Sequence, residues 1–156
     1  MATARSVIHL LALGAVSWVF SEGMFWARLR PDQSVADVAM TWLAYTVIGC
    51  LALAAARYAA VSTVAGLFLV GALYGWLIEG AVAGTAFDQI PLQISWTGLA
   101  WHAPLTVCLG WYALPVALRQ GTPRDAVLVV GGLGLGLGLW AAGYVHDEEV
   151  AAVPSN

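Results

Sequence analysis

The hydrophobic residues of this chain fall into five long runs, which short polar connections separate. Each run approaches the length of about 20 mainly apolar residues that a helix needs to cross the hydrocarbon core of a bilayer. The pattern therefore predicts five transmembrane helices, at about residues 6–27, 38–57, 61–84, 94–118 and 126–145. Pro104 and Pro115 fall inside the fourth and are expected to kink it. Because the connections are short, consecutive helices are expected to be antiparallel neighbours.

The composition agrees with an all-α integral membrane protein. Of the 156 residues, 61% are hydrophobic and 10% are charged, whereas about 25% of the residues of an ordinary soluble domain are charged. The net charge is −3 and the six basic residues are all arginines. So few charges cannot cover a water-soluble surface, and no basic patch is present that could bind nucleic acid. We expect membrane lipid as a partner and no nucleic acid.

The arginines predict how the helices are oriented in a cell membrane. Cytoplasmic loops of membrane proteins are enriched in basic residues. One side of this membrane would receive Arg5, Arg57, Arg119 and Arg124, and the other would receive Arg28 and Arg30 among acidic residues. The bias favours a cytoplasmic N-terminus and a C-terminus outside.

Two stretches of the chain resemble each other, which suggests an internal duplication. Residues 10–23 (LLALGAVSWVFSEG) match residues 67–80 (LFLVGALYGWLIEG) at an offset of 57, and residues 41–45 (TWLAY) match residues 97–101 (TGLAW) at an offset of 56. Both copies start on the same side of the membrane, so they would be parallel repeats about an axis along the membrane normal. The single transmembrane domain, residues 1–156, would then contain repeat 1 at about 6–58, repeat 2 at about 61–119, an extra helix at about 124–146 and an acidic tail at 147–156.

The duplication places Glu22 and Glu79 at matching depth in the membrane. An ionised acid deep in the hydrocarbon core costs about 2.5–3.5 kcal/mol or more, so both are expected to face the interior of the bundle. Two adjacent carboxylates in an apolar medium cannot both be ionised at low cost, and one shared proton is expected. His102 lies at a similar depth and could accept that proton. These three residues are the candidate catalytic groups, although the glutamates could instead fix helix packing and His102 could be structural.

Aromatic and hydroxyl side chains surround the predicted acids. Helical spacing places Trp18, Glu22 and Trp26 on one stripe and puts Trp76 next to Glu79. The candidate substrate-binding residues are Trp18, Thr41, Tyr45, Trp76, Thr97 and Trp101. We assign Trp26, Trp96 and Trp111 instead to the membrane–water interface, where tryptophan concentrates. No cofactor motif occurs, and neither a cofactor nor a metal is expected, although a set of two carboxylates and one imidazole suits several divalent ions.

These features support three functions. The first is acid–base catalysis on a lipophilic substrate, such as a lipid or an isoprenoid. By layout alone, acids among aromatic residues in a helical bundle, the chain resembles membrane-embedded terpene cyclases and sterol isomerases; this implies proton-initiated cyclisation or isomerisation. The second is a proton- or cation-coupled transporter or channel subunit. The third is a structural subunit of a membrane complex.

The fifth hydrophobic run is rich in glycine. Its pairs Gly132/Gly136 and Gly134/Gly138 have the small-xxx-small spacing that lets membrane helices approach closely. This helix could therefore pack against its neighbours or join two copies of the chain in a homodimer.

Overall fold

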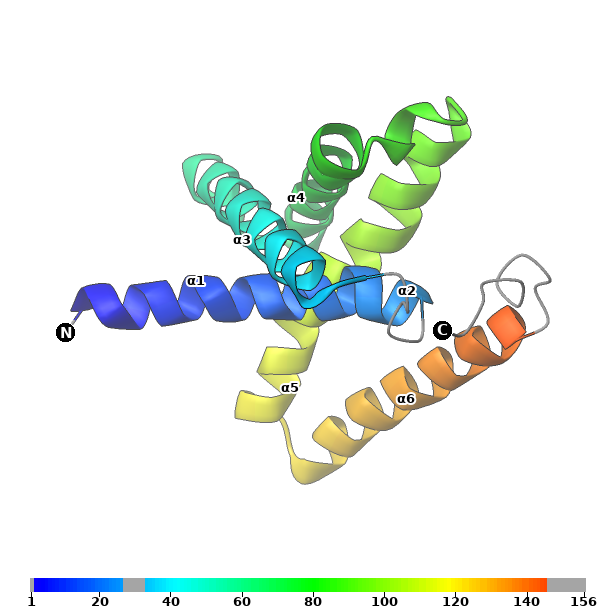
Figure 1. The fold of residues 1–156 in the computed structure, drawn as a ribbon. Helices are drawn as coiled ribbons and strands as arrows, with labels where there is room; N and C mark the ends of the chain where they lie inside the picture. Colours follow the sequence, from blue (N-terminus) through cyan, green and yellow to red (C-terminus); the bar gives the residue numbers. More distant parts are fainter. Residues whose placement is uncertain (1, 27–32, 146–156) are drawn as a thin grey trace.

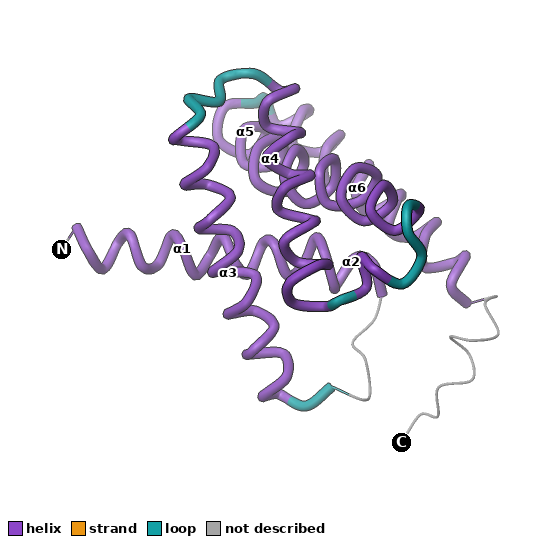
Figure 2. Tube along the Cα trace, turned by 90° about the horizontal axis from the view of Figure 1, so that it is seen from above, coloured by secondary structure: helices purple, strands orange, loops and turns teal. Residues whose placement is uncertain are grey.

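The computed structural model describes residues 2–26 and 33–145, and these residues form helices joined by short connections, without a strand (Figures 1 and 2). The predicted acidic tail and the arginines at 28 and 30 lie outside the described residues. The first helical segment consists of α1 (Ala2–Trp18), the π-helical turn η1 (Val19–Gly23) and α2 (Met24–Trp26). The second is α3 (Val35–Tyr58), and the third is α4 (Val64–Leu77) with the π-helical η2 (Ile78–Ala83). After the short 3₁₀ turn η3 (Thr85–Phe87) come the π-helical η4 (Ile94–Ala113), α5 (Leu114–Gln120) and α6 (Pro123–Val145).

Local sequence signals explain where these helices begin and end. Ser34 and Asp37 form a reciprocal capping box at the start of α3, and Thr63 accepts a hydrogen bond from the Gly66 backbone N–H at the start of α4. Such side chains satisfy backbone groups that the first helical turn leaves unpaired. At the end of η2, Gly84 has a φ of +81°, a left-handed conformation that glycine adopts without steric penalty.

Four of the helical segments are long and apolar enough to cross a membrane. They are Ser6–Trp26, Val35–Tyr58, Val64–Ala83 and Pro123–Gly143. The predicted fourth span, residues 94–118, is helical in η4 and α5 but is not among these four, and the count of five spans stays a prediction. Its sequence explains its lower hydropathy, because polar residues such as Thr97, His102 and Thr106 interrupt the apolar run.

The core lies where α3, α4 and η4 meet. Its buried residues are Tyr45, Ile48, Ala52, Val70, Tyr74, Ile78 and Val107. The α4 and η4 helices approach closely because α4 has glycines at the crossing: a Cβ on Gly71 would lie 2.6 Å from the Ala103 Cα, and one on Gly75 would lie 2.8 Å from the His102 Cβ. The crossing therefore brings His102 next to the helix that carries Glu79.

In Figure 1, α1 crosses the bundle, with α3, α4 and η4 above it and α5 and α6 below. Pro104 lies within η4, and Pro115 lies in the first turn of α5, which continues η4 directly because Ala113 and Leu114 both have the right-handed helical conformation. The α6 helix is the least buried of the candidate spans. No atom lies within 4 Å of a Cβ added to any of its described glycines, so nothing in the described chain packs closely on its glycine pairs.

Candidate functional site

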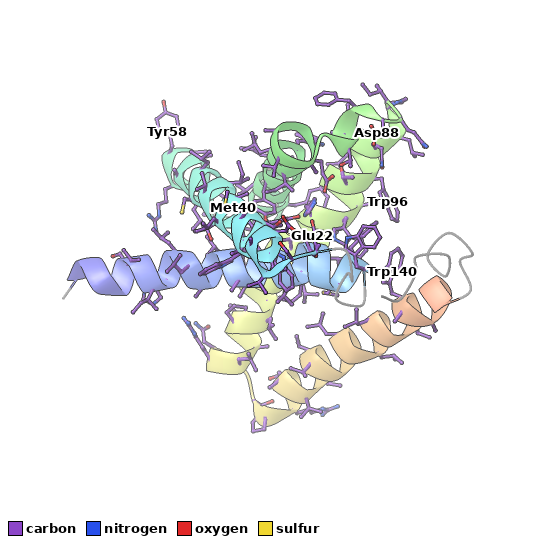
Figure 3. The ribbon with its side chains drawn as sticks, viewed as in Figure 1. Glu22, Met40, Tyr58, Asp88, Trp96 and Trp140 are labelled. Atoms are coloured by element: carbon purple, nitrogen blue, oxygen red, sulfur yellow. The ribbon has the colours of Figure 1, made fainter. Side chains whose placement is uncertain are left out.

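A cavity of about 220 Å³ lies between the ends of the helices that carry the two glutamates. Figure 3 shows Glu22 in the middle of the bundle, where α1, α3 and η4 come together. The polar residues that line the cavity are Ser21, Glu22, Tyr45, Glu79, Thr85, Gln93, Thr97 and His102. Its aromatic lining residues are Phe25, Trp26, Trp96 and Trp101. The cavity thus combines two acids, one imidazole, one phenol and the rings of one phenylalanine and three tryptophans.

Glu79 is paired with His102. Oε1 of Glu79 lies 2.9 Å from Nε2 of His102, and the side chains are 16% and 3% exposed. The hydroxyl of Thr85 donates a hydrogen bond to Oε2 of the same carboxylate. One proton can move between Glu79 and His102 without rearrangement of either side chain, which is the geometry required of an acid–base pair.

A hydroxyl network holds the other nitrogen of His102. Nδ1 lies 3.2 Å from the hydroxyl oxygens of both Ser21 and Thr106, which are themselves 3.2 Å apart. A hydroxyl can donate to a neutral imidazole nitrogen or accept from a protonated one. The network therefore accommodates His102 in either protonation state, and the edge of the Tyr74 ring, 5.6 Å from the imidazole between centroids, fixes the position of His102 further.

Glu22 has different partners. The Tyr45 hydroxyl donates to Oε1 at 2.8 Å, and the Trp26 indole N–H donates to Oε2 at 3.0 Å. Both donors are neutral, and an indole N–H cannot accept a hydrogen bond. This environment stabilises Glu22 as a hydrogen-bond acceptor with fixed carboxylate oxygens.

The two acid–partner contacts occupy matching positions along the chain. Glu79 lies 57 residues after Glu22, and His102 lies 57 residues after Tyr45. The helix crossings repeat with the same separation: Gly14 faces Thr46, and Gly71 faces Ala103. In space, the counterpart of Tyr45 is therefore His102, whereas the sequence match at an offset of 56 had paired Tyr45 with Trp101.

Most of the polar site residues come from π-helical segments. Glu22 lies in η1, Glu79 in η2, and Thr97, Trp101 and His102 in η4. A π-helix forms i→i+5 hydrogen bonds, which widen the turn, and such turns occur frequently at functional sites. In each case the wider turn changes the direction in which the following side chains point.

The cavity contains six of the nine residues that the sequence proposed for catalysis or substrate binding: Glu22, Tyr45, Glu79, Thr97, Trp101 and His102. Thr97 is buried, and its hydroxyl donates to the Gln93 carbonyl at 2.7 Å.

Three candidate residues do not line the cavity. Trp18 packs against the core and lines an apolar hollow with Trp42. Trp76 is 40% exposed and donates its indole N–H to the Ile94 carbonyl. Thr41 is half-buried on α3. The π-turns η1 and η2 explain why Trp18 and Trp76 do not line the cavity. Side-chain spacing taken from an ideal α-helix does not hold across a wider turn.

Sequence reasoning missed several residues of the cavity. Trp26 and Trp96 were assigned to the membrane interface, but both line the cavity, and Trp26 donates to Glu22. The spacing of four between Glu22 and Trp26 was a usable signal for that contact. Thr85 and Ser21 had no comparable signal, because their contacts depend on the turn after η2 and on the position of η4.

The described residues contain no group of three or more His, Cys, Asp or Glu side chains that could hold a metal ion. The two carboxylates and the imidazole thus share a cavity without forming a ligand set. Comparisons of the chain with family models, curated proteins and solved structures found no significant match.

Proposed function

We propose that this membrane protein performs acid–base chemistry on a lipophilic substrate, as a proton-initiated isomerase or cyclase. The observation that carries the proposal is the pair of Glu79 and His102, with 2.9 Å between oxygen and nitrogen, at the wall of an aromatic cavity. A positioned acid–base group contributes about 10²–10⁴-fold to a reaction rate. The pair can supply a proton and take one back, as both reactions require.

The proposed reaction conserves protons. Protonated Glu79 gives its proton to one carbon of a substrate double bond, or to an epoxide oxygen, and leaves a cation on the substrate. A neighbouring carbon then loses a proton to His102 or to the Glu79 carboxylate, and a new double bond forms. The Glu79–His102 pair regains its proton, so the site returns to its initial state without a co-reactant.

The remaining residues of the cavity would stabilise the cation. The rings of Phe25, Trp26, Trp96 and Trp101 line the space, and each aromatic face attracts a cation by about 0.5–2 kcal/mol. Glu22 adds a carboxylate that neutral donors hold in place. A fixed negative charge of this kind stabilises a developing positive charge without reorganising during the reaction.

A transporter would use the same acids differently, because it needs a polar path to both sides of the membrane. Among the described residues, the hydrogen bonds of His102 on the side away from Glu79 reach Ser21 and Thr106. Ser17 and Thr46, two other buried hydroxyls, donate to backbone carbonyls of their own helices. This arrangement favours a site with one open side, and hence catalysis over coupled transport.

The proposal includes a membrane topology. The Ile94–Ala113 helix and α5 would form a fifth span, with the N-terminus in the cytoplasm and the C-terminus outside. The first two pairs of spans would be parallel repeats. The constant separation of 57 residues between the two acid–partner contacts and between the two glycine crossings supports the duplication.

The test replaces each acid by its amide. Glu22→Gln and Glu79→Gln are expressed singly, folding is checked by thermal denaturation in detergent, and lipid extracts of the host membranes are compared by mass spectrometry. We expect both variants to fold and Glu79→Gln to abolish the lipid change that the wild-type protein causes. Asp88→Asn is the matched control, because Asp88 is an exposed carboxylate outside the cavity (Figure 3).

Folded amide variants with wild-type lipid profiles would rule out the catalytic role. A loss of solute or proton uptake without any lipid change would support the transporter instead.

A further inference from the structure

A second cavity, of about 430 Å³, lies beneath α6. Leucines of η4 and α6 form its walls together with Gly132 and Gly136, and none of its lining residues is charged. Trp140 closes one end: its indole N–H donates to the Phe25 carbonyl at 2.7 Å, and its ring lies 5.2 Å from that of Trp101 between centroids. In Figure 3, Trp140 points from α6 toward the bundle.

Trp101 belongs to the walls of both cavities. Its side chain is 8% exposed, and its buried indole N–H has no hydrogen-bond acceptor among the described residues. An unpaired buried donor costs about 1–3 kcal/mol. A ligand oxygen at the junction of the two cavities would provide the missing acceptor.

The sizes of the cavities show how a ligand could be divided between them. Sites for small molecules usually have volumes of about 300–1,000 Å³. The acidic cavity, at about 220 Å³, is smaller than this, whereas the apolar one, at about 430 Å³, falls within the range. A lipophilic molecule therefore does not fit in the acidic cavity as a whole, but its polar end does.

The charges of the acidic cavity restrict that polar end further. Among the described residues, its lining includes two glutamates and no arginine or lysine. A phosphate or diphosphate group would meet negative charge without a compensating cation. The chemistry favours an uncharged head group that carries an oxygen.

We propose that the cavity beneath α6 binds the linear apolar chain of a lipid whose uncharged, oxygen-bearing end lies beside Trp101 in the acidic cavity. This inference rests on the proposed function, because it names the substrate class of the same site. The two cavities together form one amphipathic binding site, in which α6 covers the chain and the acid–base pair meets the head.

The test uses hexadecanol with a photoreactive diazirine in the middle of its chain, added to the full-length protein in detergent. We expect light to link the probe to residues that line this cavity, such as Leu133 and Leu137 on α6 and Leu105 on η4. Gly136→Phe would fill this cavity and lower the yield of these links about tenfold or more. Gly138→Phe is the matched control, because Gly138 does not line the cavity and has open space around it, and it should retain the wild-type yield.

Two results would overturn the inference: labelling spread evenly over the outer faces of α1 and α3, or equal yields from Gly136→Phe and Gly138→Phe. The labelling does not depend on catalysis. Specific labelling with unchanged lipid extracts in Glu79→Gln would contradict the proposed function alone. Loss of the lipid change in Glu79→Gln without specific labelling would contradict the substrate inference alone.

Discussion

The two halves of the acidic cavity present the same contact with different chemistry. On one side Glu22 accepts a hydrogen bond from Tyr45, and on the other Glu79 is paired with His102. Glu79 follows Glu22 by 57 positions, and His102 follows Tyr45 by the same number. The close helix contacts of Gly14 with Thr46 and of Gly71 with Ala103 are separated by the same 57 positions. The difference lies in the partner: a phenol in one half and an imidazole, which can carry a proton on either nitrogen, in the other.

This contrast assigns separate roles to two acids that look alike in the sequence. The partner in the Glu79 half is an imidazole, and this imidazole connects to the hydroxyls of Ser21 and Thr106. The Glu22 half offers a fixed acceptor. Two contacts at matching positions can therefore differ in chemistry when one partner residue differs.

The largest expected effect comes from removing the exchangeable proton. His102→Gln keeps a hydrogen-bonding side chain of similar reach but cannot accept a proton at neutral pH. We expect the rate of the protein-dependent lipid change to fall about 10²–10⁴-fold, measured from lipid extracts over time. His9→Gln, at an exposed position on α1, serves as the control, and equal rates in the two variants would contradict the proton-transfer role of His102.

A smaller effect, on stability, is expected from the helix crossings, and it should appear in both halves. In Gly71→Ala the new Cβ would lie 2.6 Å from the Ala103 Cα, and in Gly14→Ala it would lie 1.8 Å from the Thr46 Oγ1. Overpacking of this kind typically costs about 1–3 kcal/mol. Both variants should unfold at lower temperature in detergent, and Gly71→Ala more so, because its nearest neighbour is backbone.

Gly134→Ala is the control for these variants, since no atom lies within 4 Å of its added Cβ. A wild-type unfolding temperature for Gly71→Ala would show that α4 and η4 do not cross as closely as described.

The smallest effect is expected on the Glu22 side. Tyr45→Phe removes one of two donors to Glu22 but leaves Trp26 in place. Losing a hydrogen bond to a charged group costs about 1.5–3 kcal/mol, so the rate should fall about ten- to a hundredfold. Tyr112→Phe, an exposed tyrosine outside the cavity, is the control. A loss as large as that of His102→Gln would mean that the two halves share one chemical role.

The fold could be predicted from the sequence further than the site could. Hydrophobic runs located the four helices of the described chain that are long and apolar enough to cross a membrane, because length and apolarity are properties of local sequence. Glu22 and Glu79 were found because acids are rare in such segments and each precedes a glycine in matching stretches. That both acids line one cavity agrees with their expected inward direction.

The errors have a common physical cause. Trp18 and Trp76 were selected by α-helical spacing, but π-turns follow both residues. A π-turn results from side-chain packing between helices and leaves no periodic signal in the sequence. The same limitation affected the match between residues 41–45 and 97–101. That match pairs Tyr45 with Trp101, whereas the residue that contacts Glu79 as Tyr45 contacts Glu22 is His102, one residue further along η4.

The hydrogen bonds that lead from His102 to Ser21 and Thr106 also determine how the site would respond to an energised membrane. Moving one elementary charge through the whole transmembrane field changes its energy by about 2.3 kcal/mol per 100 mV. A proton that enters and leaves this cavity from one side crosses none of that field in a complete cycle. Turnover should therefore be the same in polarised and depolarised vesicles, and only the pH on the open side should control the rate.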